Sequence, residues 1–196
     1  MIERKISGIL LAGGKSKRMG KDKAFINYLG KELYRYPLEI LEHFCDDIII
    51  STSNSLFLET GYKLCPDEIS GIGPMGGIYT CLKETKHEYS LVLGCDTPLI
   101  NHHIIRELIA HISAHSVVVA MNSEGFPESL IGIYKKTCSD SLKSRIEKQN
   151  FKMSDFLRDE KALFHNLSLP HSDLLKLFSN INTKQDLQSL PKYGKE

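Results

Sequence analysis

The stretch ISGILLAGGKSKRMGKDKA, residues 6–24, joins a short apolar run to a loop with paired glycines and several cations. The apolar run over residues 6–11 is typical of a strand buried on both sides of a sheet. Gly13 and Gly14 let the backbone approach a ligand closely and expose its amide N–H groups. The loop could bind phosphate or could be only a solvated basic loop. Its position after the first buried strand favours a phosphate site, for which the available cations are Lys15, Lys17, Arg18, Lys21 and Lys23.

Two glycine patterns look like known nucleotide motifs, but their spacing and context argue against both. A Walker A loop that ends in Gly14-Lys15-Ser16 needs its first glycine at position 9, which is Ile9. The stretch GIGPMG at residues 71–76 matches G-x-G-x-x-G, but it does not follow a predicted strand. Its proline also removes an amide that a dinucleotide turn would use. Neither a Walker A loop nor a dinucleotide fold is predicted.

Predicted strands and helices alternate along most of the chain. Apolar or β-branched runs predict strands at 48–51, 62–65, 89–94, 117–119 and 130–134. Helical spacing predicts helices near 33–44, 75–86 and 104–112, with Pro37 tolerated only in a first turn, and the chain is more polar and helical after 137. Alternation of this kind predicts an α/β fold with a mainly parallel sheet and helices on both faces, which binds ligands at the carboxyl ends of its strands.

Two aspartates lie where such a ligand would bind. Asp96 directly follows the predicted strand 89–94, and Asp67 follows the weaker strand 62–65. Mg²⁺ usually takes one or two carboxylates together with phosphate oxygens, so these residues are candidate magnesium ligands. The alternative is that Asp96 only caps a turn before the helix that begins near Asn101.

Composition limits the class of protein and its partners. The 196 residues suffice for one domain with a substantial core, and the formal net charge of +1 indicates neither a nucleic-acid partner nor an anionic membrane. No segment reaches the length of a membrane span or of a secretory signal. The cysteines are odd in number and form no C-x-x-C pair, so we expect reduced thiols and a cytoplasmic protein: Cys45, Cys65, Cys81, Cys95 and Cys138.

Other residues that could carry chemistry have simpler interpretations. His111 and His115 could share a helix face as zinc ligands do, but Ile112 stands where H-E-x-x-H needs glutamate. Cys95 has no identifiable partner base, so it is interpreted as a small buried hydrophobic residue rather than a nucleophile.

Four motifs, taken together, resemble the molybdenum cofactor guanylyltransferase family, within the nucleotidyltransferases that share a Rossmann-like sheet. LAGGKSKRMGKDKA at 11–24 looks like the family's LAGGxSxRMGxDKA, and GPMGGI at 73–78 looks like GPLGGI. CDTP at 95–98 is similar to CD-x-P, and FSNINT at 178–183 is similar to FxNxNT. The resemblance spans nearly the whole chain. It implies one Rossmann-like nucleotidyltransferase domain over 1–196, with an N-terminal part that binds GTP and a C-terminal part on the pterin side.

The resemblance also implies roles for individual residues. Arg18 and Lys23 match phosphate-contacting cations, and Asp96 matches the aspartate that holds Mg²⁺; these are the candidate catalytic residues. Asn180 and Asn182 match asparagines on the side of the pterin acceptor. The implied nucleotide-binding residues are Leu11, Ala12, Gly13, Gly14, Lys23, Ser51, Asp67 and Asp96.

The sequence departs from the family pattern at a few positions. Ser51 stands where relatives often carry asparagine, and Ser129 replaces the proline of the usual E-P-L. Lys184 and Gln185 replace a proline and an acidic residue after the last motif. None of these departures removes a residue that the implied chemistry needs.

The implied reaction transfers GMP from GTP to molybdenum-molybdopterin and releases pyrophosphate. Mg²⁺ is the implied cofactor, and cofactor-inserting proteins or recipient molybdoenzymes are the implied protein partners. Transfer of a cytidylyl group, or of a nucleotide to a sugar phosphate, is an alternative, although Leu11-Ala12-Gly13-Gly14 favours guanine over the LAAG of cytidylyl relatives. A GTP-binding adaptor without catalytic activity is a second alternative.

Overall fold

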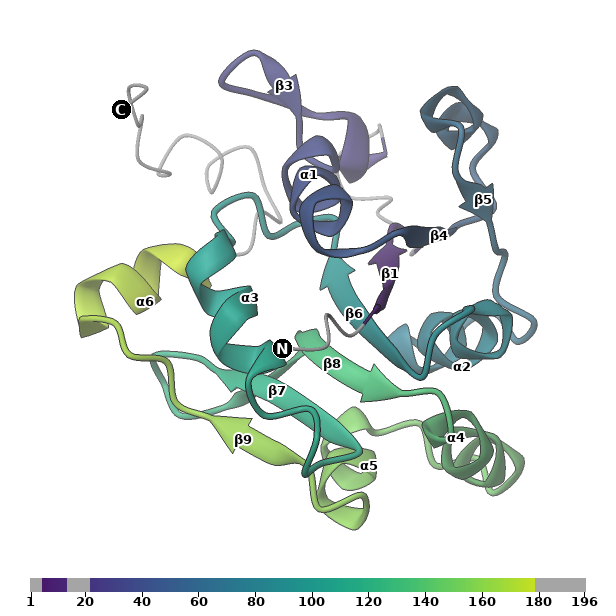
Figure 1. Ribbon diagram of the computed structural model, residues 1–196. Coiled ribbons are helices and arrows are strands. Elements are labelled where there is room, and N and C mark those ends of the chain that lie inside the picture. The colour runs from purple at the N-terminus through teal and green to yellow at the C-terminus, as the bar shows by residue number, and fades with distance from the viewer. Residues whose placement is uncertain (1–4, 14–21, 179–196) are drawn as a thin grey trace.

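A seven-stranded sheet forms the centre of the computed structural model, which describes residues 5–13 and 22–178 (Figure 1). The strand order across the sheet is β5-β4-β1-β6-β8-β7-β9. The strand bounds are β1 Ser7–Leu11, β4 Asp47–Ser51, β5 Lys63–Leu64, β6 Tyr89–Gly94, β7 Val117–Met121, β8 Pro127–Lys135 and β9 Leu163–His165.

Most strand pairs in this sheet are parallel, as predicted. β1 pairs in parallel with β4 on one side and with β6 on the other, and β4–β5 and β7–β9 are also parallel pairs. β8 is antiparallel to both of its neighbours, β6 and β7. β7 therefore runs in the same direction as β1 and β6, and the turn between β7 and β8 lies at the carboxyl edge of the parallel strands.

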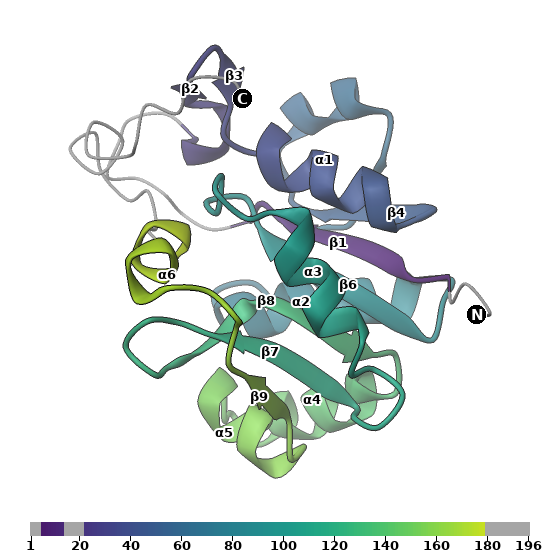
Figure 2. The ribbon, with the colours of Figure 1, turned by 60° about the vertical axis from the view of Figure 1, so that its left-hand side comes forward.

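Helices cover both faces of the sheet, which confirms the predicted layering (Figure 2). Buried side chains of α1, α3 and α6 pack in one core cluster, and those of α2, α4 and α5 pack in another. The helix bounds are α1 Arg35–Phe44, α2 Pro74–Glu84, α3 His102–Ile109, α4 Cys138–Glu147, α5 Met153–Asp159 and α6 His171–Leu177. In the described part of the chain, we find no helix with the length and apolar character that crossing a membrane requires.

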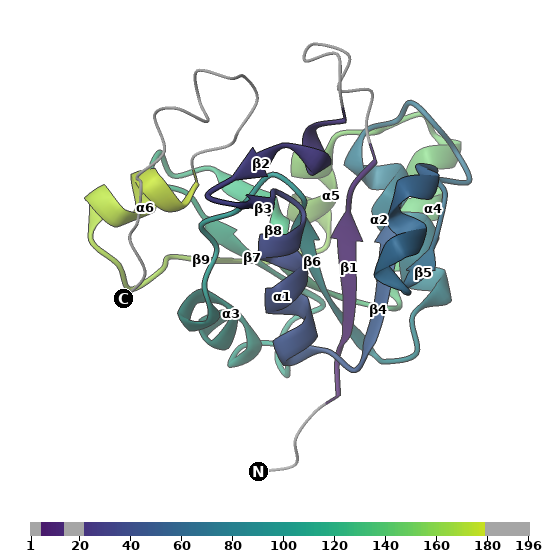
Figure 3. The same cartoon turned by 90° about the horizontal axis from the view of Figure 1, so that it is seen from above.

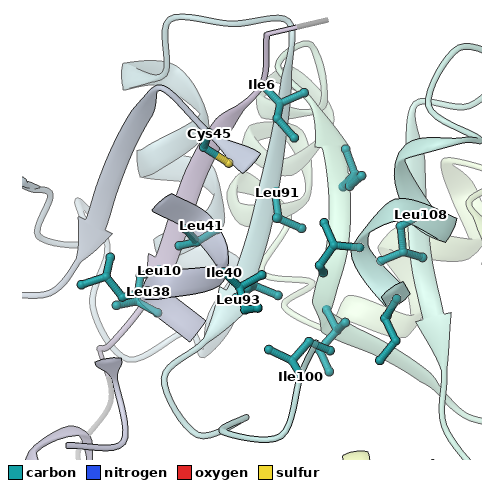
Figure 4. Close-up of a cluster of buried hydrophobic side chains, with 14 of the residues drawn as sticks. Ile6, Leu10, Leu38, Ile40, Leu41, Cys45, Leu91, Leu93, Ile100 and Leu108 are labelled. Carbon is teal, nitrogen blue, oxygen red and sulfur yellow. The ribbon is translucent and has the colours of Figure 1, made fainter. Parts of the chain in front are cut away.

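The central strand β1 is buried along its whole length because a layer of helices lies on each side of it. Alternate residues serve opposite faces: Leu10 packs in the cluster beneath α1 and α3 (Figure 4), whereas Ile9 packs in the cluster beneath α2. Gly8 permits close packing, because a Cβ there would lie 3.2 Å from Leu41 Cδ2 and 3.3 Å from Cys45 Sγ. Pro37 falls in the first turn of α1, as predicted.

Several short elements have no counterpart in the sequence prediction. They are the hairpin β2 Asn27–Tyr28 and β3 Lys31–Glu32, the 3-10 turns η2 Lys23–Phe25 and η3 Ser55–Thr60, and strand β9. Each is too short to show a hydrophobic period of its own. The predicted helix over 104–112 ends earlier, at Ile109, so His111 and His115 do not share a helix face.

Gly132 of β8 lies at a crowded point of the sheet, opposite Val92 on one side and Val119 on the other. A Cβ at this position would lie 2.6 Å from Val119 Cγ1 and 2.8 Å from the Val118 carbonyl oxygen. The carbonyl is part of the sheet backbone and cannot move aside independently.

We therefore expect Gly132→Ala to lower the free energy of unfolding by about 1–3 kcal/mol, the usual cost of overpacking. The measurement is the urea midpoint followed by circular dichroism. A midpoint equal to that of the unmodified chain would contradict this packing of β8 against β7.

Candidate active site

The carboxyl ends of β1, β4 and β6 meet at one edge of the sheet (Figure 3). Leu11 at the end of β1 pairs in register with Ser51 of β4 and Gly94 of β6. Two hydrogen bonds continue the pairing: the Ala12 amide donates to the Ser51 carbonyl at 3.1 Å, and the Cys95 amide donates to the Leu11 carbonyl at 3.0 Å. The backbone predicted to seat a nucleotide therefore lies between the ends of two flanking strands.

The side chains of Ser51 and Asp67 are in contact next to Leu11, the last residue of β1. The Ser51 hydroxyl donates to Asp67 Oδ1 at 3.0 Å, and Ser51 is buried. Near the start of α2, a Cβ on Gly77 would lie 2.5 Å from Ser51 Oγ, 2.9 Å from Leu11 Cδ2 and 3.3 Å from Asp67 Oδ1. A glycine is needed here because any larger residue would displace this group. Ser51 orients the carboxylate of Asp67 in this arrangement.

Lys23 and Asp96 form an ion pair between residues 73 positions apart, with Nζ 2.6 Å from Oδ2. Only 12% of the lysine side chain and 20% of the aspartate side chain are exposed, so their attraction is screened less than that of a surface pair. The cap of α3 is Asn101, whose Oδ1 accepts hydrogen bonds from amides of its first turn, whereas Oδ2 of Asp96 accepts from Lys23. The structure thus brings together two of the predicted catalytic side chains.

A hydrogen-bonded clamp holds the short turn that carries Lys23. Asp22 Oδ1 accepts from the Ala24 amide at 3.1 Å, and Asp22 Oδ2 accepts from Asn54 Nδ2 at 2.7 Å. Asn54 Oδ1 in turn accepts from the Leu56 amide at 3.0 Å and caps η3. One asparagine therefore connects the segment after β4 with the turn that positions the ammonium group.

Apolar packing anchors the same turn. Ala24 is fully buried, and the ring of Phe25 lies 5.3 Å from that of Tyr34 and 4.8 Å from that of Phe57, measured between centroids. Sequence reasoning missed Asp22 and Asn54, the members of the clamp. Their signal was present, because aspartate and asparagine are preferred immediately before the first residue of a helical turn.

The predicted residues Gly14, Arg18, Asn180 and Asn182 lie outside the described residues, as do the other loop cations Lys15, Lys17 and Lys21. The part of the site that can be described therefore consists of the ends of three strands, the Lys23 turn and the start of α2.

The side chains of the remaining candidates supply no reactive or metal-binding group at this edge. All five cysteines are free thiols. Burial raises the pKa of Cys95 to about 12, so its thiol stays protonated and is no nucleophile near neutral pH. His111 instead contacts His165, with the two rings tilted and their centroids 4.7 Å apart. Over residues 5–13 and 22–178, we find no group of three or more His, Cys, Asp or Glu side chains able to hold a metal ion.

Comparison with known proteins identifies the family. The family model described as a MobA-like NTP transferase domain matches residues 8–164, which is most of the chain. The chain belongs to the MobA-like NTP transferases. It is a nucleotidyltransferase, and the matched region extends from β1 to β9, across the whole central sheet.

Curated relatives cover nearly all of this MobA-like chain. A protein of Natranaerobius thermophilus, named probable molybdenum cofactor guanylyltransferase, is 30% identical over 96% of this chain and 96% of its own length. A Bacillus subtilis protein of the same name is 33% identical over 93% of this chain and 92% of its own length.

Solved structures agree with the fold. An Aquifex aeolicus protein is 26% identical, with a TM-score of 0.76 over 92% of this chain and 95% of the other. Molybdopterin-guanine dinucleotide biosynthesis protein A from Archaeoglobus fulgidus is 21% identical, with a TM-score of 0.74 over 93% of this chain and 95% of the other. The second likeness concerns the fold alone.

In this MobA-like NTP transferase, we expect the clamp formed by Asp22 and Asn54 to affect activity more than its effect on stability alone would explain. Asn54→Ala removes the hydrogen bond to Asp22 and the cap of η3, so we expect a melting temperature lower by about 2–4 °C. We also expect NTP-dependent pyrophosphate release to slow by about tenfold, because Lys23 is then held less firmly.

The matched control is Asn101→Ala, which removes the asparagine cap of α3 and leaves the clamp around Lys23 intact. It should cost similar stability with turnover within about twofold of the unmodified chain. Equal loss of turnover in the two variants would contradict a positioning role for Asn54.

Proposed function

We propose that this nucleotidyltransferase transfers GMP from GTP to the phosphate of molybdenum-molybdopterin, forming molybdopterin guanine dinucleotide and releasing pyrophosphate. The observation that carries the proposal is the Lys23–Asp96 ion pair beside the backbone that ends β1, where a cation and a carboxylate serve one phosphate-binding edge. The names of the curated relatives support the choice of substrates.

The N-terminal part would bind GTP and the C-terminal part would contribute to the pterin side. The exposed Gly13 allows phosphate or sugar atoms to approach the backbone that follows β1. Asp67, oriented by Ser51, would accept a hydrogen bond from a donor of the nucleoside. Asn180 and Asn182 belong to the proposed pterin side on the strength of the motif they share with the family, and Arg18 joins Lys23 at the phosphates on the same basis.

The donor set at the edge fits Mg²⁺ bound together with substrate. Asp96 offers a hard carboxylate oxygen at the end of β6, and Mg²⁺ commonly takes one or two carboxylates plus phosphate oxygens. An all-protein cage would need more ligands than the described residues gather in one place. Asp96 would hold the ion, which when bound would supply positive charge to the reacting phosphates.

The protein's own contribution to the reaction is alignment and charge neutralisation. An oxygen of the acceptor phosphate forms a bond to the α-phosphorus of GTP, and the bond from that phosphorus to the bridging oxygen of the β-phosphate breaks. The electron pair of the broken bond leaves with pyrophosphate. The attacking oxygen is already anionic near neutral pH, so no side chain must remove a proton from it. Lys23 would stabilise the charge that grows on pyrophosphate.

The ion pair between Lys23 and Asp96 holds the ammonium and the carboxylate in position for alignment and charge neutralisation. Nζ of Lys23 lies at the carboxylate of Asp96, so phosphate oxygens that reach the carboxylate also come within reach of the ammonium. The clamp through Asp22 and Asn54 holds the turn, so little side-chain ordering is left to be achieved as the substrates meet.

Removing either charged group should abolish most of the transfer while the fold persists. For Asp96→Ala and Lys23→Ala we expect turnover to fall by about a hundredfold or more, because each removes charge compensation at the phosphates. Each substitution removes one charge of a largely shielded ion pair, so each variant should melt at a lower temperature but remain folded. The measurements are guanylyl transfer to molybdenum-molybdopterin and a thermal melt of each variant.

Lys63→Ala is the control, since Lys63 also forms a 2.6 Å ion pair, with Glu84, but both partners are about half exposed. This variant should transfer GMP at the normal rate. Guanylyl transfer near the normal rate by Asp96→Ala would overturn the assigned role of that residue.

Nucleotide choice is a separate prediction. With molybdenum-molybdopterin as acceptor and equal concentrations of GTP, CTP or ATP, we expect GTP to support pyrophosphate release at least about tenfold faster, a difference near 1.4 kcal/mol. Faster release from CTP would identify a cytidylyltransferase. Binding of GTP without pyrophosphate release would indicate a non-catalytic carrier.

A further inference from the structure

The turn between β7 and β8 presents an exposed aromatic side chain at the edge that carries the candidate active site. β7 runs parallel to β6 and β1 across the sheet, so this turn lies at the carboxyl edge of the parallel strands (Figures 2 and 3). Gly13 follows β1 and Asp96 follows β6 at the same edge. Phe126 lies in the turn with 62% of its surface exposed. A large apolar ring left in water at the rim of a site is a candidate ligand contact.

The turn is held rigidly by Asn122. Its Oδ1 accepts from the amides of Glu124 at 3.0 Å and Phe126 at 2.9 Å, and its Nδ2 donates to Glu128 Oε1 at 2.8 Å. The Asn122 amide also donates to the Phe126 carbonyl at 2.9 Å, and Gly125 takes a φ of 80° that favours glycine. The backbone of Phe126 is therefore fixed from both its amide and its carbonyl side.

Strand β8, which follows the turn, places Leu130 beside the side chain of Asp96. Leu130 Cδ1 and Asp96 Oδ1 lie 3.4 Å and 2.7 Å from the point that a Cβ on Gly94 would occupy, so these two side chains are neighbours. Phe126 precedes Leu130 by four residues, a span of at most about 14 Å even for a fully extended chain. The backbone that carries the phenyl ring is thus joined by a short segment of β8 to a residue that neighbours the Asp96 carboxylate.

An irregularity in β8 shapes the intervening segment. The pairing of β8 with β7 shifts after Val119, so that Val119 pairs with Gly132 whereas Ala120 pairs with Glu128. The extra residues of β8 form a bulge, and the Tyr134 hydroxyl donates to the carbonyl of Ser129 in it at 2.6 Å. Bulges of this kind redirect side chains near active sites, and this one lies between Phe126 and the neighbourhood of Asp96.

We propose that Phe126 is a specificity-determining residue that packs its ring against the pterin of the acceptor. This inference rests on the proposed function. In that reaction the acceptor's phosphate lies at Lys23 and Asp96, and its fused rings extend from that phosphate through a methylene group. Asn122 acts as a positioning residue by fixing the turn. A flat heterocycle with a polar edge is the kind of ligand that an exposed phenyl ring on a rigid turn can select by stacking.

The kinetic test compares Phe126→Ala with Phe126→Tyr and with the unmodified chain. Phe126→Ala should raise KM for molybdenum-molybdopterin about tenfold, as expected for the loss of one stacking partner, with KM for GTP within about twofold. Phe126→Tyr keeps an aromatic ring and should stay within about threefold of the unmodified chain for both substrates. The control Phe164→Ala removes another exposed phenyl ring, on the outer strand β9, and should leave both KM values unchanged.

A second measurement follows binding without turnover. The chain contains no tryptophan, so Phe126→Trp introduces a single indole at the turn. Adding molybdenum-molybdopterin should change its fluorescence with a midpoint near KM, whereas the indole of Phe164→Trp should not respond. Circular dichroism melts show whether each variant is folded before it is titrated.

The outcomes separate the two proposals. An unmodified chain that transfers GMP to molybdenum-molybdopterin, together with an unchanged acceptor KM in folded Phe126→Ala, would overturn the role of Phe126 and leave the proposed function standing. An unmodified chain that does not transfer GMP to this acceptor would overturn the proposed function, and the inference with it. A rise in KM for GTP alone would place Phe126 on the nucleotide side and would also overturn the inference.

Discussion

The pairing of β1 with a parallel strand on each side organises both the core and the candidate active site. It requires a chain that is apolar on both faces, because helices cover the sheet above and below. It also aligns Leu11 with Ser51 and with Gly94, so the segments that leave three strands emerge at one place. The candidate active site is a direct consequence of this register.

At that edge, an ion pair and the packing of the turn that carries Lys23 together fix the charged groups of the site. The Lys23–Asp96 pair is largely shielded from water, which strengthens the attraction but makes it important that both groups are held in place. The turn that carries Lys23 is fixed by Asp22, by Asn54 and by the buried Ala24. The parts of the site are therefore set by several weak contacts from segments that are distant in sequence.

The fold could be predicted from sequence wherever an element is long enough to show its own period. The strand 89–94 and the helix over 33–44 were predicted close to their observed bounds for this reason. The strand predicted at 62–65 is confirmed as β5, whereas β9, with three residues that depend on pairing with β7, has no local pattern that predicts it. The helix that ends at Ile109 was predicted too long because the apolar spacing continues into the turns after it.

Residue type and spacing are enough to predict the fold class, a glycine-rich loop after the first strand, and Lys23, Asp67 and Asp96 as candidate site residues. These features are visible because residue type and spacing along the chain are local properties. The contacts of Lys23 with Asp96, of Ser51 with Asp67 and of Asn54 with Asp22 become visible only in the folded chain. These contacts join residues far apart in the chain, and their distances follow from strand register and helix packing, which no short segment encodes.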